Sequence, residues 1–141
     1  MEAQATMIFI DTGAFVARYR KADQWHATAR KGWKFLAKRQ TRCFTSNLVL
    51  AEAARLLRPY AGAAQIPRLM GTWLQSELMT VLRSTIEDEL AAVDVMVKFV
   101  DQQVGFVDGV SFTLMRRHHI ERTFGFDQHF EYAGFTLWPP K

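Results

Sequence analysis

Four carboxylates stand in stretches of sequence that otherwise resemble a buried core. Asp11 follows an apolar run, Glu52 interrupts a mostly aliphatic segment, and Asp108 and Asp127 each follow aromatic and aliphatic residues. Acidic side chains are almost never fully buried without a partner. The pattern therefore predicts one shared site, in which a cation offsets the repulsion between the four acids.

The chemistry of such a site follows from its charge. Four ionised carboxylates carry about -4, and like charges a few ångströms apart raise one another's pKa. One Mg²⁺, or Mn²⁺ as a substitute, reduces the charge to about -2, and a second ion with a bound phosphodiester leaves about -1. Oxygen ligands without clustered Cys or His disfavour zinc. We therefore expect hydrolysis of a phosphodiester by a metal-activated water.

Each acid also has a structural explanation when it is taken alone. Asp11 could be a turn residue, Asp108 a helix cap, Asp127 part of an Asx turn, and Glu52 a residue on an exposed helix edge. The conjunction of the four favours a site, because the predicted elements place all of them at one end of a sheet or on helices beside it.

The order of the predicted elements indicates the fold class. Strands are predicted at 7–10, 42–45, 79–82, 122–126 and 134–138, and helices at about 23–40, 46–57, within 61–78, 85–101 and 107–118. We take Pro59 as the stop of the second helix. Alternating strands and helices predict a three-layer α/β/α sandwich with a central, mainly parallel sheet, in which ligands bind beyond the carboxyl ends of the strands.

These elements position the four acids. Asp11 and Asp127 are expected at carboxyl ends of strands, and Asp108 in the first turn of a helix, where free backbone amides stabilise its charge. Glu52 is one helical turn from Leu48 and Leu56, which predicts that it shares the core-facing side of its helix.

Length and composition fit one domain spanning residues 1–141, with residues 1–6 as a flexible leader. The single cysteine, Cys43, rules out an intrachain disulfide and is expected as a buried strand residue. A signal peptide and a membrane-spanning segment are both missing from the pattern, so we expect a cytoplasmic protein.

Basic residues are concentrated near the start of the chain. Nine of the 18 Lys and Arg residues lie between Arg18 and Arg42, against one acid, Asp23. A polyanion such as RNA could dock there through counterion release. A solvated helix face is an equally good explanation of the charge alone.

Several segments together carry a resemblance to a known family. They are Phe9–Phe15, Thr45–Glu52, Val107–Phe112 and, above all, Phe126–Phe135. These segments resemble PIN domain ribonucleases, and in particular VapC-like toxins of toxin-antitoxin modules. The resemblance implies a Mg²⁺-dependent endoribonuclease with RNA as its substrate, a cognate antitoxin as its partner and a homodimeric state.

The same resemblance assigns roles to individual residues. It implies that the catalytic, metal-binding acids are Asp11, Glu52, Asp108 and Asp127, with Asp11 and Asp108 as direct ligands, and that the hydroxyl of Thr12 supports the site.

Three positions depart from the family pattern. Val107 replaces a Ser or Thr before the third acid, Gly125 replaces a Thr two positions before the fourth, and Gln128 replaces an Arg after it. The lost hydroxyls could weaken hydrogen bonds that orient the acids. Because the acids themselves are present, we expect an active enzyme.

Other functions remain as alternatives. A non-catalytic RNA-binding module could keep the same fold, and a nuclease of this architecture could cut DNA. The segment Asp11-Thr12-Gly13 also matches the signature of dimeric aspartic proteases. That alternative requires a strand-rich chain and leaves the other three acids unexplained.

Two further features have more than one interpretation. His129 could contact substrate phosphate, although a structural hydrogen bond in the turn before Phe130 is the favoured explanation. Met70, Trp73, Leu74 and Leu78 form an apolar stripe, which is more often part of a core than a groove for a partner such as the antitoxin.

Overall fold

A computed structural model describes residues 7–140, so the leader expected at residues 1–6 lies outside the described residues. Five strands form one parallel sheet in the order β3-β2-β1-β4-β5. The strands are β1 (Met7–Ile10), β2 (Arg42–Ser46), β3 (Met79–Leu82), β4 (Arg122–Phe124) and β5 (Thr136–Trp138). The expected parallel sheet is confirmed.

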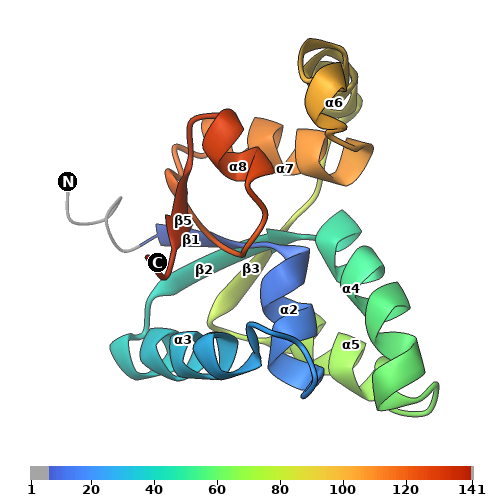
Figure 1. The fold of residues 1–141 in the computed structure, drawn as a ribbon, viewed down its shortest axis with the longest axis vertical. Coiled ribbons are helices and arrows are strands. Elements are labelled where there is room, and N and C mark those ends of the chain that lie inside the picture. The colour runs from blue at the N-terminus through green and yellow to red at the C-terminus, as the bar shows by residue number, and fades with distance from the viewer. Residues whose placement is uncertain (1–6, 141) are drawn as a thin grey trace.

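Helices cover both faces of this sheet (Figure 1). One layer contains α2 (Thr12–Tyr19), α3 (His26–Arg39), α4 (Asn47–Ala61) and α5 (Ile66–Gln75). The other contains α7 (Phe106–Arg117) and α8 (His129–Tyr132), with α6 (Ile86–Lys98) packed against α7 and followed by the 3₁₀ turn η1 (Val100–Gln102). The predicted α/β/α sandwich is therefore confirmed.

The central strand β1 is held from both sides. Ile8, Phe9 and Ile10 are fully buried, as expected for an inner strand of a covered parallel sheet. The hydroxyl of Thr45 donates to the carbonyl of Ile10 over 2.8 Å, and the hydroxyl of Thr123 donates to the carbonyl of Phe9 over 3.1 Å. These bonds fix the end of β1 from which Asp11 emerges.

Two of the predicted helix starts are confirmed by their caps. The Ser46 hydroxyl accepts a hydrogen bond from the backbone of Val49 at the start of α4. Thr85 and Asp88 form a reciprocal capping box at the start of α6.

Several expected boundaries were wrong. Helix α4 continues past Pro59 to Ala61, because a proline in the last turn of a helix removes only one of its final hydrogen bonds. Asp23 does not begin α3 directly. Its carboxylate accepts a hydrogen bond from the backbone of Trp25, and the helix starts at His26.

Two short helices, α2 and α8, were not predicted. Helix α2 has only eight residues, with Gly13 among them, and it follows β1 after a single residue. Helix α8 has four residues. Helices this short show little periodicity, and tertiary packing decides their existence. Helix α2 follows directly on Asp11, and α8 begins two residues after Asp127, so both help to position the site.

Cys43 is buried in β2, as expected, and burial raises the pKa of its thiol to about 11. Among the described residues, no helix is long and apolar enough to cross a membrane.

Candidate active site and metal centre

The four predicted acids line one pocket of about 310 Å³, which we call the acidic pocket. Each acid comes from a different part of the fold. Asp11 joins β1 to α2, Glu52 projects from α4, Asp108 lies in the first turn of α7, and Asp127 follows β4. The pocket therefore lies at the carboxyl end of the sheet, where ligands bind in folds of this class.

Asp11 is the most buried acid of the four, with 5% of its surface exposed. Its backbone N–H donates to the carbonyl of Phe124 over 2.9 Å, which ties the end of β1 to the end of β4. Burial raises the pKa of Asp11 well above its ordinary value, and the charges of Asp108, Asp127 and Glu52 raise it further. A backbone hydrogen bond from Thr12 offsets part of this effect.

Asp108, Asp127 and His129 form the tightest cluster in the pocket region. One potential ligand atom from each lies within 4.8 Å of the others. The His129 ring nitrogen Nδ1 lies 2.9 Å from Oδ2 of Asp108 and 3.4 Å from Oδ1 of Asp127. The backbone N–H of His129 also donates to Oδ1 of Asp127 over 2.9 Å. His129 therefore couples the third and fourth acids.

This histidine contact sets the local electrostatics. Burial raises the pKa of Asp108, while the hydrogen bond from His129 lowers it in part and the charge of Asp127 raises it again. Burial lowers the pKa of His129, but the hydrogen bond to Asp108 and the charges of Asp127 and Asp108 outweigh it, so the pKa of His129 is raised. The two carboxylates therefore favour the protonated form of the imidazole that lies between them.

The favoured prediction for His129, a structural hydrogen bond in the turn before Phe130, agrees with the bond from its backbone N–H to Asp127, but it did not include the contact of its ring with Asp108. The sequence feature that could have indicated a role in the site is its position two residues after Asp127. The partner is 21 residues away in the sequence, and only the packing of α7 beside α8 brings it near.

Glu52 was predicted to share the core-facing side of α4, and this prediction was wrong. The buried side of this helix consists of Val49, Leu50, Ala53 and Leu57, whereas Glu52 is half-buried and Leu56 is exposed. Glu52 and Leu56 both line the acidic pocket. The face of α4 that carries Glu52 is therefore turned toward this pocket and away from the core.

The donor set fits a divalent cation of the Mg²⁺ type. The pocket offers several carboxylate oxygens, and no cysteine lines it. The hydroxyl of Thr12 is also buried there without a hydrogen-bond partner among the described residues, so it is free to bind a ligand or its water shell. The acids, with this orphaned hydroxyl, can therefore hold a divalent metal.

The structure explains two of the departures from the family pattern. Val107 is partly buried against the main core, so its side chain contributes packing where a hydroxyl would contribute a hydrogen bond. Gly125 is buried against Asp11. A Cβ at this position would lie 3.0 Å from Cβ of Asp11 and 3.4 Å from its Oδ2. The absence of a side chain at Gly125 thus permits the close approach of β4 to Asp11.

Comparison with known proteins agrees with this fold and site. The PIN domain family model matches residues 8–135. The chain is 34% identical over 140 residues to the "23S rRNA-specific endonuclease VapC20" of two Mycobacterium tuberculosis strains, covering 96% of this chain and 100% of each relative. The chain therefore belongs to the PIN domain family, and the expectation of an endonuclease of the VapC-like toxin class is confirmed.

Solved structures show the same relationship. The crystal structure of M. tuberculosis VapC20, described as a "Sarcin-Ricin loop cleaving toxin", superposes with a TM-score of 0.82 at 30% identity and covers 92% of this chain and 96% of that one. FitAcB from Neisseria gonorrhoeae superposes with a TM-score of 0.67 at 14% identity, covering 95% and 98%, which shows the shared fold alone.

Replacing Asp11 by asparagine should stabilise the protein in EDTA near pH 7 and above. Because the pKa of Asp11 is raised in the folded protein, folding favours the protonated form, and stability is lost as the pH rises through that pKa. Asn imitates the protonated acid. We expect the Tm of Asp11→Asn to exceed that of wild type by about 4 °C for each kcal/mol of relief, and the difference to vanish below about pH 4.

Thermal unfolding from below about pH 4 to above about pH 7, with and without Mg²⁺, measures this difference in Tm. Mg²⁺ should raise the Tm of wild type more than that of the variant, because ligands that bind only the folded state stabilise it. Asp94→Asn, an exposed acid on α6, is the control. An Asp11→Asn protein that melts below wild type at every pH in EDTA would contradict the argument.

Proposed function

We propose that this PIN domain hydrolyses RNA phosphodiester bonds at the acidic pocket in a Mg²⁺-dependent reaction, as the toxin of a toxin-antitoxin pair. The observation that carries the proposal is the convergence of Asp11, Glu52, Asp108 and Asp127 from separate elements on one pocket of about 310 Å³. The similarity to a relative named for its action on 23S rRNA supports RNA as the substrate.

The chain's own residues have distinct tasks in this proposal. Asp11, Asp108 and Asp127 hold the ion, and Glu52 completes its ligands directly or through a water. His129 restrains the carboxylates of Asp108 and Asp127, because it contacts both. When bound, Mg²⁺ activates water as a nucleophile and offsets the charge that develops on the phosphate; Mn²⁺ can replace it.

The surroundings of the pocket favour an unpaired RNA strand. The partly exposed rings of Trp25 and Phe126 line the acidic pocket beside the carboxylates. In A-form duplexes the deep major groove hides the bases, whereas loops present them to a protein. The substrate is therefore a structured RNA that is cut in an exposed loop.

The protease alternative does not fit the fold. Asp11-Thr12-Gly13 begins a helix at the end of a parallel strand, next to three other acids. A signature protease needs two such loops in a strand-rich dimer.

Replacing one direct ligand should abolish cleavage. We expect Asp108→Asn to lower the rate of cutting of a structured RNA by about 100-fold or more, because the site would lose one of the charges that would hold the cation. The measurement is gel analysis of end-labelled RNA with Mg²⁺, and EDTA should stop the reaction until Mn²⁺ or Mg²⁺ is restored. Asp94→Asn should cut at the wild-type rate.

The same assay separates the alternatives. A non-catalytic module would bind RNA yet give no product at any metal concentration, and a DNA-directed enzyme would prefer a DNA loop of the same sequence. Cutting by wild type in EDTA, or undiminished cutting by Asp108→Asn, would contradict the metal mechanism.

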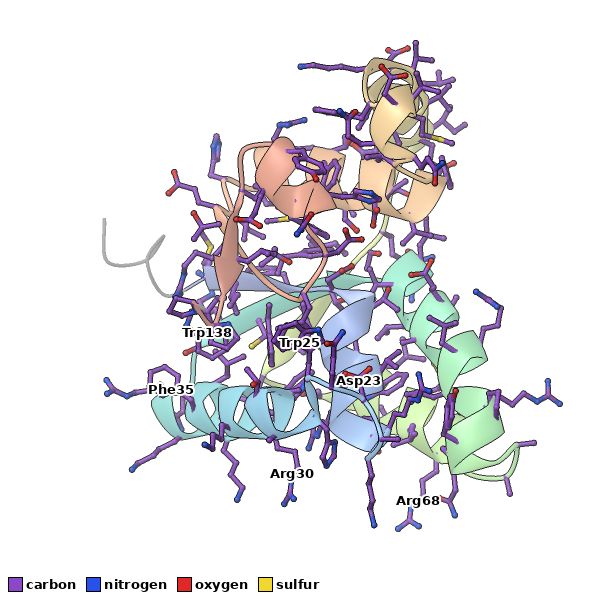
Figure 2. All side chains as sticks on the ribbon, in the orientation of Figure 1. Asp23, Trp25, Arg30, Phe35, Arg68 and Trp138 are labelled. Carbon is purple, nitrogen blue, oxygen red and sulfur yellow. The ribbon has the colours of Figure 1, made fainter. Side chains whose placement is uncertain are left out.

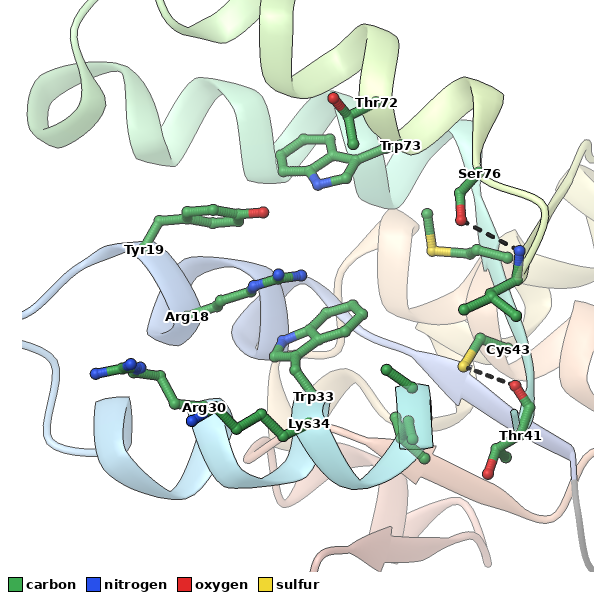
Figure 3. A pocket seen from close by; sticks show the side chains of 14 residues that line it. Arg18, Tyr19, Arg30, Trp33, Lys34, Thr41, Cys43, Thr72, Trp73 and Ser76 are labelled. Atoms are coloured by element: carbon green, nitrogen blue, oxygen red, sulfur yellow. Dashed lines mark hydrogen bonds between the residues drawn. The ribbon is translucent and has the colours of Figure 1, made fainter. Parts of the chain in front are cut away.

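A basic groove supports an antitoxin as the second partner. It is a pocket of about 490 Å³ lined by Tyr19, Trp33 and Trp73, with the cations Arg18, Arg30 and Lys34 around it (Figure 3). The Arg18 guanidinium lies 4.9 Å from the centre of the Trp33 ring. Thr41, Cys43 and Met79 also line it, so the groove lies at the amino ends of β2 and β3, away from the acids.

The charge of this basic groove indicates its occupant. Within residues 7–140, Arg18, Arg30 and Lys34 form no ion pair with an acid. These three cations also do not line the acidic pocket, so they are less suited to guiding RNA to it than the sequence suggested. An antitoxin segment that combines acidic and apolar side chains complements both the cations and the aromatic lining.

Reversing the charge of this basic groove should weaken the antitoxin without harming the enzyme. Arg30→Glu together with Lys34→Glu should reduce affinity for the antitoxin, expected from the neighbouring reading frame, by about tenfold or more. Calorimetry measures binding, and RNA cutting should stay within about twofold of wild type. Lys38→Glu, on the same helix but outside the groove, is the control. Unchanged antitoxin affinity in the double variant would show that the basic groove is not part of the antitoxin interface.

An apolar stripe along α6 and into the η1 turn that follows it supports homodimerisation. Ile86, Leu90, Val93, Val97 and Val100 recur at helical spacing and are 46–76% exposed. Exposed aliphatic rows of this kind mark contact surfaces. A second copy of the chain can cover the row symmetrically by packing the same helix against itself.

The stripe gives a direct test of the oligomeric state. Leu90→Glu with Val97→Glu should convert the dimer to a monomer in sedimentation velocity, because the apolar contact would then bury charges. Tyr60→Glu, at an exposed aromatic on α4, should leave the dimer intact. A monomeric wild type, or a double variant that stays dimeric, would contradict this interface.

A further inference from the structure

A stacked pair of aromatic rings forms one wall of the acidic pocket. The rings of Trp25 and Phe126 are parallel within 3°, and their centroids are 5.0 Å apart. The same two side chains line two neighbouring pockets, of about 910 Å³ and about 500 Å³. This aromatic stack is therefore the common boundary of three hollows, one of which contains the four acids.

The aromatic stack is firmly held. The Phe126 ring meets the fully buried ring of Phe124 nearly edge-on, at 6.3 Å and 77°. The Trp25 backbone N–H donates to Asp23 over 2.8 Å, and its carbonyl accepts from the N–H of Ala29 over 2.8 Å. Figure 2 labels Asp23 and Trp25 beside α2. Ring surfaces that are already ordered lose little entropy when a ligand stacks on them.

The larger neighbour, which we call the edge pocket, has the chemistry of a site for a flat, uncharged ring. Its lining includes Phe135, Leu137 and the two final prolines of the described chain, together with the hydroxyl residues Thr28 and Thr136. Glu131 is the only ionisable residue among those that line it, so a phosphate would be repelled there. A nucleobase offers apolar faces and hydrogen-bonding edges, which match this lining.

The wall that the edge pocket shares with the acidic pocket indicates which nucleotide supplies that base. Both pockets share Trp25 and Phe126, and Gly125, which lines the edge pocket, packs against Asp11. A strand whose phosphate lies among the acids therefore has its neighbouring nucleotide beside the aromatic stack.

We propose that the edge pocket and the aromatic stack bind one base of the RNA strand adjacent to the cleaved phosphodiester. This inference rests on the proposed function, because the acidic pocket fixes where the phosphate lies. Stacking on aromatic side chains holds bases of any identity, since each base has a π-face. Trp25 and Phe126 are thus positioning residues, which set the strand relative to the acids.

The test is a binding cycle between protein variants and short RNAs. Fluorescein-labelled single-stranded RNA heptamers, intact or with one abasic nucleotide at each position in turn, are titrated by anisotropy with Ca²⁺ in place of Mg²⁺. For wild type we expect one position at which removal of the base weakens binding about tenfold. The intact heptamer should bind to Trp25→Leu about tenfold more weakly than to wild type. In this variant, removal of the same base should weaken binding by less than about twofold.

Two matched variants make the test specific. Trp25→Phe keeps a ring and should recover most of the affinity. Phe35→Leu removes an exposed ring near the other end of α3, outside the three pockets, and should bind like wild type (Figure 2). Circular dichroism and thermal unfolding show whether each variant is folded.

Three results would overturn the inference. They are no measurable binding of the heptamers, an abasic penalty that persists unchanged in Trp25→Leu, and a Trp25→Leu protein that loses affinity for the antitoxin but not for RNA. The last result would identify a protein-docking surface. Because binding is measured apart from turnover, a protein that binds the base through Trp25 but cuts no RNA would refute the proposed hydrolysis and leave only the base-binding site itself standing.

Discussion

Repulsion among the carboxylates of the acidic pocket is the constraint on which the site depends. Asp11 is almost fully buried, and three other acids line the same small pocket. The protein supplies only local compensation, through a backbone hydrogen bond at Thr12 and the imidazole of His129 between Asp108 and Asp127. Folding without a cation therefore holds the acids in an unfavourable arrangement that a divalent ion relieves. Metal binding and the stability of this region are linked as a consequence.

The sheet contributes to this arrangement because it holds the most buried acid, Asp11, in place. Strand β1 is buried on both faces and paired on both edges, and the hydroxyls of Thr45 and Thr123 add bonds to its carbonyls. The end of β1 is tied to β4 by the bond from Asp11 to Phe124. The backbone of Asp11 cannot move away from the other acids without breaking these contacts. The rigid core thus fixes the position of Asp11 in the site.

Features carried by local sequence were predictable. The apolar runs predicted the five strands, Ser46 and Thr85 predicted two helix starts, and the types and order of the four acids predicted their shared pocket. Features that depend on packing between distant segments were not. Contact between His129 and Asp108 arises from the approach of α8 to α7, and the outward turn of Glu52 depends on which side of α4 faces the sheet. The stacking of Trp25 on Phe126 joins segments about a hundred residues apart.

The contact between Gly125 and Asp11 limits how this chain can change. A Cβ at Gly125 would lie 3.0 Å from Cβ of Asp11, closer than an ordinary van der Waals contact, so the buried Asp11 side chain would have to shift by a few tenths of an ångström. A Thr at this position, which the family often has, therefore requires Asp11 to adjust its position. The end of β1 and the end of β4 are packed and hydrogen-bonded to each other, so a chimera with a relative should exchange the two together. A Thr introduced at Gly125 alone would therefore press on Asp11 within the acidic pocket, although sequence comparison would suggest only the return of a hydroxyl.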